Sequence, residues 1–124
     1  MSVFEKVTGA IRSGMKFRTP VQNAAFTIDS VNAERVVFFV GDKTLIPIPK
    51  AIWDDIPDFL RGKGWVRIGV RHDVAEKNTL QYFIDHHPSR GTQHSADANY
   101  VASVLESLRI VDVKHRKPSE IILK

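Results

Sequence analysis

The stretch ERVVFFVGDKTLIPIP, residues 34–49, decides the fold class. Its two runs at 34–40 and 43–49 are rich in β-branched and aromatic residues, and a Gly-Asp turn between them predicts two adjacent strands. A similar run at 24–30 predicts a strand before them, which makes an antiparallel meander. The first quoted run is apolar on both faces and should be central and covered on each side. Pro47 predicts an edge strand, because proline cannot donate to a sheet ladder.

Helical periodicity flanks this meander. Apolar residues at 3–11 recur with the spacing of a short amphipathic helix. The segment 50–62 has the same periodicity, but Pro57 interrupts it, so we expect two consecutive helical turns, with Pro57 opening the second and Gly62 closing it. A fourth strand is predicted at 64–71, where apolar residues alternate cleanly with others.

The last third of the chain combines helices with a hairpin. Periodicity predicts a helix at 79–87, capped by Asn78 or Thr79, and a second helix that opens at Ser95. Two strand-like runs at 110–124 are joined by residues with the turn chemistry of a hairpin. Apolar continuity and matching periodicity place five residues in the core: Phe38, Phe39, Ile68, Leu105 and Ile121.

These elements predict an α+β fold: a small, mainly antiparallel sheet with a helical insertion, packed with a carboxyl-terminal helical part that ends in a β-hairpin. The chain should divide into 1–74 and 75–124, or form one compact domain over 1–124. Its 124 residues, 43% of them hydrophobic, suffice for a core. The absence of cysteine excludes disulfides, thiolate zinc sites and a cysteine nucleophile. With no signal peptide and no long apolar run, we expect a cytoplasmic protein without a membrane partner.

The net charge of +4 favours an anionic partner, and basic residues gather in two places along the chain. The predicted hairpin turn carries Lys114, His115, Arg116 and Lys117, where long side chains can reach outward. Arg90, in the loop between the two last helices, is a further candidate for contact with phosphates.

The polar face of the predicted fourth strand is the second basic place. It carries Trp65, Arg67 and Arg71, with Gly69 allowing close approach, a pattern that can stack a base and hold phosphates. The alternative interpretation is that Trp65 is a core residue beneath the preceding helix and that both arginines pair with nearby acids. Those acids are Asp54, Asp55 and Asp58.

The order of helix, loop, helix and basic hairpin over residues 79–124, and above all YVASVLESLRIVDVKHRKPSEIILK, resembles the end of winged helix-turn-helix domains. The resemblance implies that the second helix lies in a major groove and that the hairpin turn contacts phosphates as a wing. Two features depart from that family: only two of three helices are recognisable, and the second helix offers no basic side chain before Arg109. The alternative interpretation is that this helix is a packing element and that the hairpin alone contacts an anion. The periodicity of the second helix should expose Asp97, Asn99, Ser103, Glu106 and Ser107.

The phrase IDHHP, residues 84–88, resembles the signature of the DHH phosphoesterases, whose two metal ions activate water against a phosphodiester. The chain lacks a DxD cluster in its first 80 residues, is too short for the two-domain body of that family, and places the triplet in a helix. We therefore expect no metal here. His87 should be partly buried on the apolar stripe, and Asp85 and His86 should face solvent.

The sequence thus predicts a non-catalytic nucleic-acid-binding protein that uses no cofactor and binds DNA in preference to RNA, through the basic hairpin and the strand face. A protein-interaction or accessory subunit is the second interpretation, and an enzyme acting on a phosphodiester is the third. Neither a nucleophilic serine turn nor a phosphate-binding glycine loop occurs with its required spacing.

Overall fold

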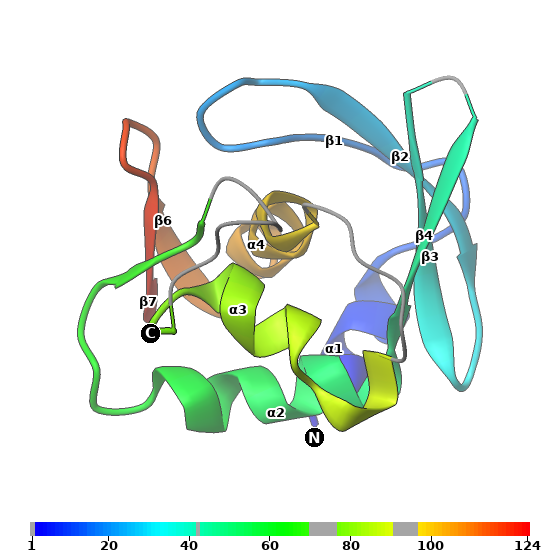
Figure 1. Ribbon diagram of the computed structural model, residues 1–124. Coiled ribbons are helices and arrows are strands. Elements are labelled where there is room, and N and C mark those ends of the chain that lie inside the picture. Colours follow the sequence, from blue (N-terminus) through cyan, green and yellow to red (C-terminus); the bar gives the residue numbers. More distant parts are fainter. Residues whose placement is uncertain (1, 42, 70–76, 91–96) are drawn as a thin grey trace.

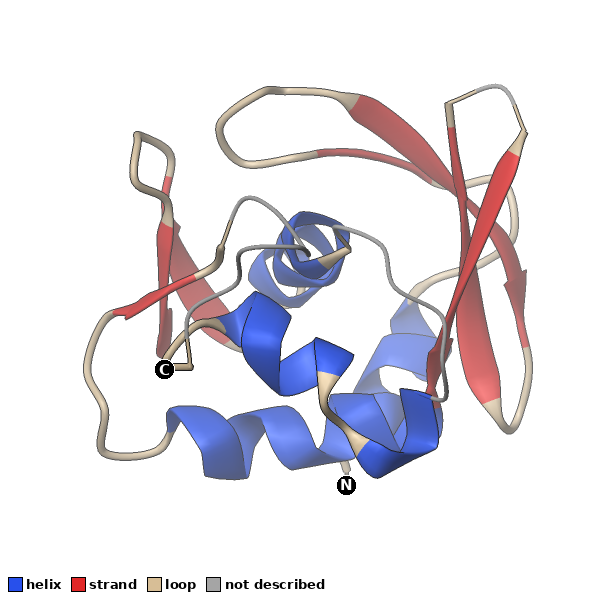
Figure 2. Ribbon diagram, viewed as in Figure 1, coloured by secondary structure: helices blue, strands red, loops and turns tan. Residues whose placement is uncertain are grey.

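The computed structural model describes residues 2–41, 43–69, 77–90 and 97–124. The elements follow one another along the chain (Figure 1) as α1 (Val3–Ala10), β1 (Lys16–Arg18), β2 (Ala25–Val31), β3 (Arg35–Val40), β4 (Thr44–Pro49), α2 (Lys50–Leu60), β5 (Val66–Arg67), α3 (Leu80–Asp85), the 3-10 helix η2 (Pro88–Arg90), α4 (Ala98–Ser107), β6 (Val111–Lys114) and β7 (Glu120–Leu123). Two antiparallel sheets have the strand orders β1-β2-β3-β4 and β5-β7-β6. The helices lie between them (Figure 2), so the predicted α+β class is confirmed.

The first sheet is the predicted meander with one additional strand. β3 lies between β2 and β4, and its Phe38 is paired with Ile28 on one side and Ile46 on the other. The additional strand is β1, which was not predicted; it has three residues, and its Phe17 stacks on Phe26 with ring centroids 5.7 Å apart. Because β1 is short, it depends on its pairing with β2 rather than on a pattern of its own.

The edge position of β4 is confirmed, and prolines protect it. Pro47 and Pro49 lie opposite Val37 and Arg35 of β3. Neither proline has an N–H group that could donate to another strand, so this edge is less able to pair with a further strand.

The prediction that β3 is covered on both faces is wrong. Val36 and Phe38 are fully buried against the helices, but Val37 and Phe39 point to the outer face and are half-buried. Figure 1 shows no helix on that side of the sheet. Phe39 is therefore not a core residue, whereas Phe38, Ile68, Leu105 and Ile121 are buried as predicted.

The amino-terminal helix agrees with prediction, and the next one corrects it. α1 is capped by Ser2, whose hydroxyl accepts a hydrogen bond from the Glu5 N–H at 3.2 Å. α2 is one helix through Pro57. The proline removes one backbone hydrogen bond, but a continuous buried face of Ile52, Trp53, Ile56 and Leu60 holds the helix together. Gly62 follows its end with a φ of 78°, the left-handed conformation expected of a closing glycine.

The carboxyl-terminal elements appear in the predicted order. Thr79 caps α3 by accepting a hydrogen bond from the Tyr82 N–H at 3.1 Å. α4 begins at Ala98, and Ser95 lies outside the described residues. The predicted strand at 64–71 is present as β5, which is shorter. Residues 70 and 71 of the predicted strand lie outside the described residues.

One hydrophobic cluster joins both predicted segments of the chain. It contains residues from Phe4 in α1 to Ile121 in β7, and α4 lies near the middle of the molecule (Figure 1). Shared packing of this kind favours one domain over 1–124 rather than two separate units.

Candidate nucleic-acid interface

The outer face of the second sheet brings two of the predicted basic residues together. The register pairs Glu120 of β7 with Arg67 of β5 on one side and with Lys114 of β6 on the other. Directly opposed residues of antiparallel strands project to the same face, so Arg67, Glu120 and Lys114 form one row across three strands. Trp65, two residues before Arg67, belongs to the same face and is 41% exposed.

Lys114 connects the members of this face. Its ammonium lies 3.3 Å from Glu120 Oε1 and 4.5 Å from the ring centroid of Trp65. The second distance is that of a cation–π contact, which holds the indole against the sheet while one of its edges stays in solvent. The interpretation of Trp65 as a core residue is therefore wrong.

Arg67 is exposed, and none of the ion pairs among the described residues includes it. The acids proposed as its partners have other contacts. Asp58 pairs with Arg61, Asp55 pairs with His87, and Asp54 accepts a hydrogen bond from the Phe4 N–H. A shallow opening of about 480 Å³ lies beside Arg67 and also includes Lys63 and Asn78 in its lining. The guanidinium is thus available to an anion from outside.

In the hairpin turn, His115 contacts the rest of the fold and two cations are exposed. His115 Nδ1 lies 2.9 Å from the Pro20 carbonyl oxygen, and Nε2 lies 2.5 Å from Glu106 Oε2. The hydrogen bond with Glu106 raises the pKa of His115, and partial burial opposes this rise. Arg116 and Lys117 are exposed and join no ion pair among the described residues. His115 therefore positions the turn, while its neighbours point cationic side chains into solvent.

Gly69 serves the fold rather than a ligand. Its φ is 95°, a left-handed value that favours glycine, and a Cβ at this position would lie 2.9 Å from Cβ of Gln81. The Gln81 N–H donates to the Ile68 carbonyl at 2.9 Å. The close approach that the sequence indicated is therefore the approach of α3 to the end of β5.

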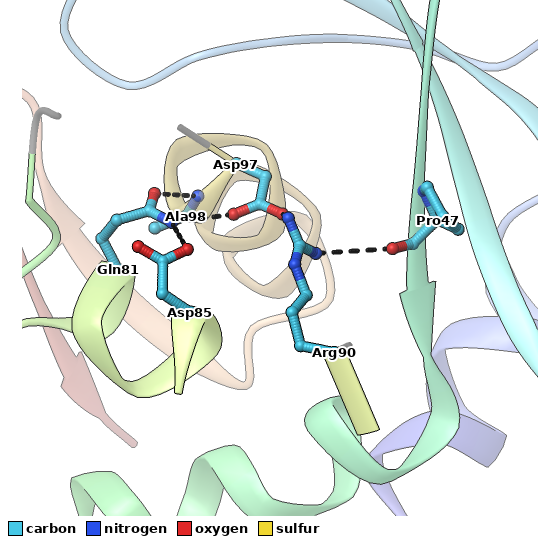
Figure 3. A network of polar contacts seen from close by, with 6 residues as sticks. All are labelled: Pro47, Gln81, Asp85, Arg90, Asp97 and Ala98. Atoms are coloured by element: carbon cyan, nitrogen blue, oxygen red, sulfur yellow. Dashed lines mark hydrogen bonds and ion pairs between the residues drawn. The ribbon is translucent and has the colours of Figure 1, made fainter. Parts of the chain in front are cut away.

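Arg90 does not belong to the interface. Its guanidinium pairs with the Asp97 carboxylate, and the two side chains are 1% and 0% exposed. Arg90 also donates to the Pro47 carbonyl oxygen at 3.5 Å, which links η2 to the edge strand β4 (Figure 3). A buried and paired arginine cannot reach a phosphate outside the protein, so the prediction that Arg90 contacts phosphates is wrong.

Gln81 completes this buried network (Figure 3). Its Nε2 donates to Oδ1 of Asp85 at 2.9 Å and to Oδ1 of Asp97 at 3.0 Å, and its Oε1 accepts a hydrogen bond from the Ala98 N–H at 2.9 Å. Burial raises the pKa of Asp97, and the nearby Arg90 charge opposes that rise. The network ties α3, η2, α4 and β4 together in the interior.

The second helix of the winged-helix resemblance is an internal element. Asp97 and Ser103, which the periodicity placed on the surface, are buried, and so is every residue from 101 to 105. The Ser103 hydroxyl donates to the Arg18 carbonyl oxygen at 2.7 Å, beside β1. A helix enclosed in this way cannot enter a major groove.

The three residues of the DHH-like triplet point in different directions. Asp85 is buried beside Gln81, which corrects the expectation that it faces solvent. His86 is exposed and stacks on Tyr82 with ring centroids 3.8 Å apart. His87 is partly buried, as predicted. The described residues contain no group of three or more metal-ligating side chains.

His87 lies between an acid and a serine. Its Nε2 is 2.7 Å from Asp55 Oδ2, and its Nδ1 is 2.8 Å from the Ser89 hydroxyl. The same Nδ1 accepts a hydrogen bond from the Ser89 backbone N–H at 3.1 Å, so the imidazole satisfies the first backbone N–H of η2. We assign these contacts to capping of that short helix.

Arg71 lies outside the described residues. Glu120, which separates the two cations of the outer face, was not among the predicted site residues. The register of the hairpin is the signal that could have identified it, since Glu120 pairs with Lys114.

No helix in the described parts of the chain is long and apolar enough to cross a membrane. Comparison with family models, with curated proteins and with solved structures found no match.

Proposed function

We propose that the protein binds nucleic acid without catalysing a reaction on it, and that the outer face of the second sheet and the hairpin turn contact phosphates. The observation that carries this proposal is the row Arg67–Glu120–Lys114, which joins the strand face to the hairpin. Arg67, Arg116 and Lys117 remain available for charge-assisted contacts, and Trp65 offers an aromatic surface to a base.

The burial of α4 limits the mode of binding. Without a helix in the groove, the phosphate contacts carry the affinity for a duplex, and readout of the base edges in its grooves is weak. The preference for DNA over RNA stays a prediction that depends on the winged-helix resemblance. We also propose a cytoplasmic location, because a chain without cysteine suits a reducing compartment.

A salt titration with matched charge variants tests this proposal. The triple variant Lys114→Gln, Arg116→Gln, Lys117→Gln should bind a fluorescent oligonucleotide more weakly than wild type, with a slope of log affinity against log salt that is flatter by up to about three phosphate equivalents. The control is Lys6→Gln, Arg12→Gln, Lys43→Gln, which removes three exposed cations elsewhere.

The control variant should retain the wild-type slope, because both variants have the same net charge and only one lacks the contacts. Equal losses in the two variants would show that total charge, rather than the hairpin, determines binding. If folded wild-type protein binds no oligonucleotide at ~50 mM salt, where phosphate contacts are strong, the proposed function is wrong.

A protein-interaction role is the second candidate, and the outer face of the first sheet favours it. Leu45, Phe39 and Thr27 form one row across β4, β3 and β2, and Val37 lies beside Pro47 on the same face. Leu45 is 49% exposed. Binding through this apolar face would depend little on salt, which separates it from phosphate contact.

A further inference from the structure

We propose that a cavity beside the hairpin turn binds one unpaired base of a single-stranded nucleic acid. The cavity lies between residues 19–24, the first turn of α4 and the turn that joins β6 to β7, and its volume is about 460 Å³. This volume falls within the range of roughly 300–1,000 Å³ that is usual for small-molecule sites. The inference rests on the proposed function and assigns the cavity a substrate class.

The walls of the cavity are fixed by contacts within the fold. The Thr19 hydroxyl accepts a hydrogen bond from the Ala24 N–H at 3.0 Å, which closes the 19–24 segment on itself. His115 of the hairpin turn contacts the Pro20 carbonyl oxygen, and this contact fixes the distance between the turn and the 19–24 segment. The Tyr100 ring packs edge-on against Phe26, with centroids 4.9 Å apart. A preformed cavity of this kind binds without a large ordering cost.

The lining combines apolar surface with polar groups that have no hydrogen-bond partner among the described residues. Val21, Ala24 and Pro118 provide apolar atoms against which a flat ring can pack. The side-chain amides of Gln22 and Asn99 take part in none of the hydrogen bonds among the described residues. Each amide has both donors and an acceptor, which is the combination that reads the Watson–Crick edge of an unpaired base.

Tyr100 also lines the cavity. Burial raises the pKa of its phenol, and the charge of Asp97 raises it further, so the hydroxyl stays protonated at neutral pH. It forms no hydrogen bond among the residues that the structure describes, and a protonated phenol can donate to a carbonyl or ring nitrogen of a base.

The charge around the cavity suits the backbone of a nucleic acid. Lys117 lines the cavity, and Arg116 precedes it in the exposed turn. No acidic residue is present in the described lining. A base seated between Gln22 and Asn99 would therefore have its own phosphate near the two cations that the proposed function already assigns to phosphate contact.

Two oligomers of equal length and charge test this inference: an oligodeoxythymidylate and an abasic deoxyribose-phosphate oligomer. Wild type should bind the base-containing oligomer about fivefold or more tightly, since stacking and hydrogen bonding to one base are worth roughly 1 kcal/mol or more. Ala24→Leu, which fills the cavity, and Asn99→Ala, which removes an amide, should reduce this preference to the part that stacking on Trp65 contributes. Both variants should keep the abasic affinity and the salt slope of wild type.

Ala51→Leu is the matched control, because Ala51 is also exposed but lies on α2. It should retain the full preference, and thermal unfolding establishes that all three variants are folded. Equal wild-type affinity for the two oligomers would overturn the base site while leaving phosphate binding by the hairpin intact. The base site is also overturned if both cavity variants keep the full wild-type preference. Absence of binding to either oligomer would instead overturn the proposed function.

Discussion

Arg67 and Lys114 stand at the two ends of one cross-strand row of the second sheet, although they lie far apart in the sequence. Glu120 occupies the position between them and pairs with Lys114 at 3.3 Å. The row therefore contains two cations and one anion, and its central carboxylate opposes the approach of a phosphate.

Glu120→Gln should consequently strengthen binding to an oligonucleotide. We expect affinity to rise about two- to fivefold at low salt, because a repulsive charge disappears and Lys114 is released for phosphate contact. The unfolding free energy should fall by less than ~1 kcal/mol, since the Lys114–Glu120 pair is partly exposed. Fluorescence anisotropy and urea unfolding measure the two effects. Weaker binding by Glu120→Gln would show that this face does not contact the phosphates.

Gly69→Ala should destabilise the protein by about 1–3 kcal/mol. The backbone at Gly69 has a left-handed φ of 95°, and the new Cβ would press on Gln81. The control is Gly9→Ala in α1, where no atom lies within 4 Å of the new Cβ, and this variant should gain about 0.5–1 kcal/mol. Urea unfolding compares both with wild type. A neutral Gly69→Ala would contradict the tight packing of α3 on the end of β5.

Arg90→Met should cost about 3–5 kcal/mol at neutral pH, because it leaves the Asp97 carboxylate buried without its cation. Burial already raises the pKa of Asp97 above its ordinary 3.8, so the Asp97 carboxyl binds a proton more tightly in the folded protein than in the unfolded chain. Protonation of Asp97 therefore stabilises the folded protein. This stabilisation is fully present below pH 3.8 and is lost as the pH rises through the pKa that Asp97 has in the folded protein. Without Arg90 the pKa should rise further.

The deficit of Arg90→Met relative to wild type should therefore narrow as the pH falls from about 7 toward about 4. Urea unfolding over this pH series provides the measurement. Arg35→Met is the control, since Arg35 forms an exposed pair with Glu34 and its loss should be small at every pH. A deficit for Arg90→Met that does not change with pH would contradict the buried pairing.

Phe38→Ala should cost about 3–5 kcal/mol, and Phe39→Ala distinctly less. Phe38 is fully buried among aromatic neighbours, whereas Phe39 is half-buried on the outer face of the same strand. The two variants remove the same atoms from adjacent positions, so thermal or urea unfolding compares the two faces directly. Similar losses in both variants would show that the outer face is covered.

Local patterns in the sequence account for most of the fold. Turn residues and alternation predicted β2, β3, β4 and the β6–β7 hairpin, because these strands pair with close neighbours in the chain. β1 was not predicted because three residues are too few to show an alternation of apolar and polar side chains, and the strand depends on its partner β2. The apolar run of β3 led to the wrong prediction that both faces of this strand are covered, because hydrophobic side chains also occur on an uncovered sheet face.

The candidate site was harder to predict, because it depends on contacts between distant segments. The exposed cations at Arg116 and Lys117 follow from turn chemistry alone. The position of Arg67 beside the hairpin depends on the pairing of β5 with β7, and the burial of Arg90 depends on Asp97. Charge on its own cannot distinguish a buried ion pair from a free surface cation.

The two indole N–H signals provide the most direct test of the interface. The chain has two tryptophans: Trp65 is exposed beside Arg67 and Lys114, and Trp53 is fully buried with its indole donating to the Ile48 carbonyl oxygen at 3.2 Å. On titration with a single-stranded oligonucleotide followed by NMR, the Trp65 signal should shift and the Trp53 signal should stay fixed. Raising the salt from ~50 to ~200 mM should reverse the shift. Binding that leaves Trp65 unchanged would contradict the account.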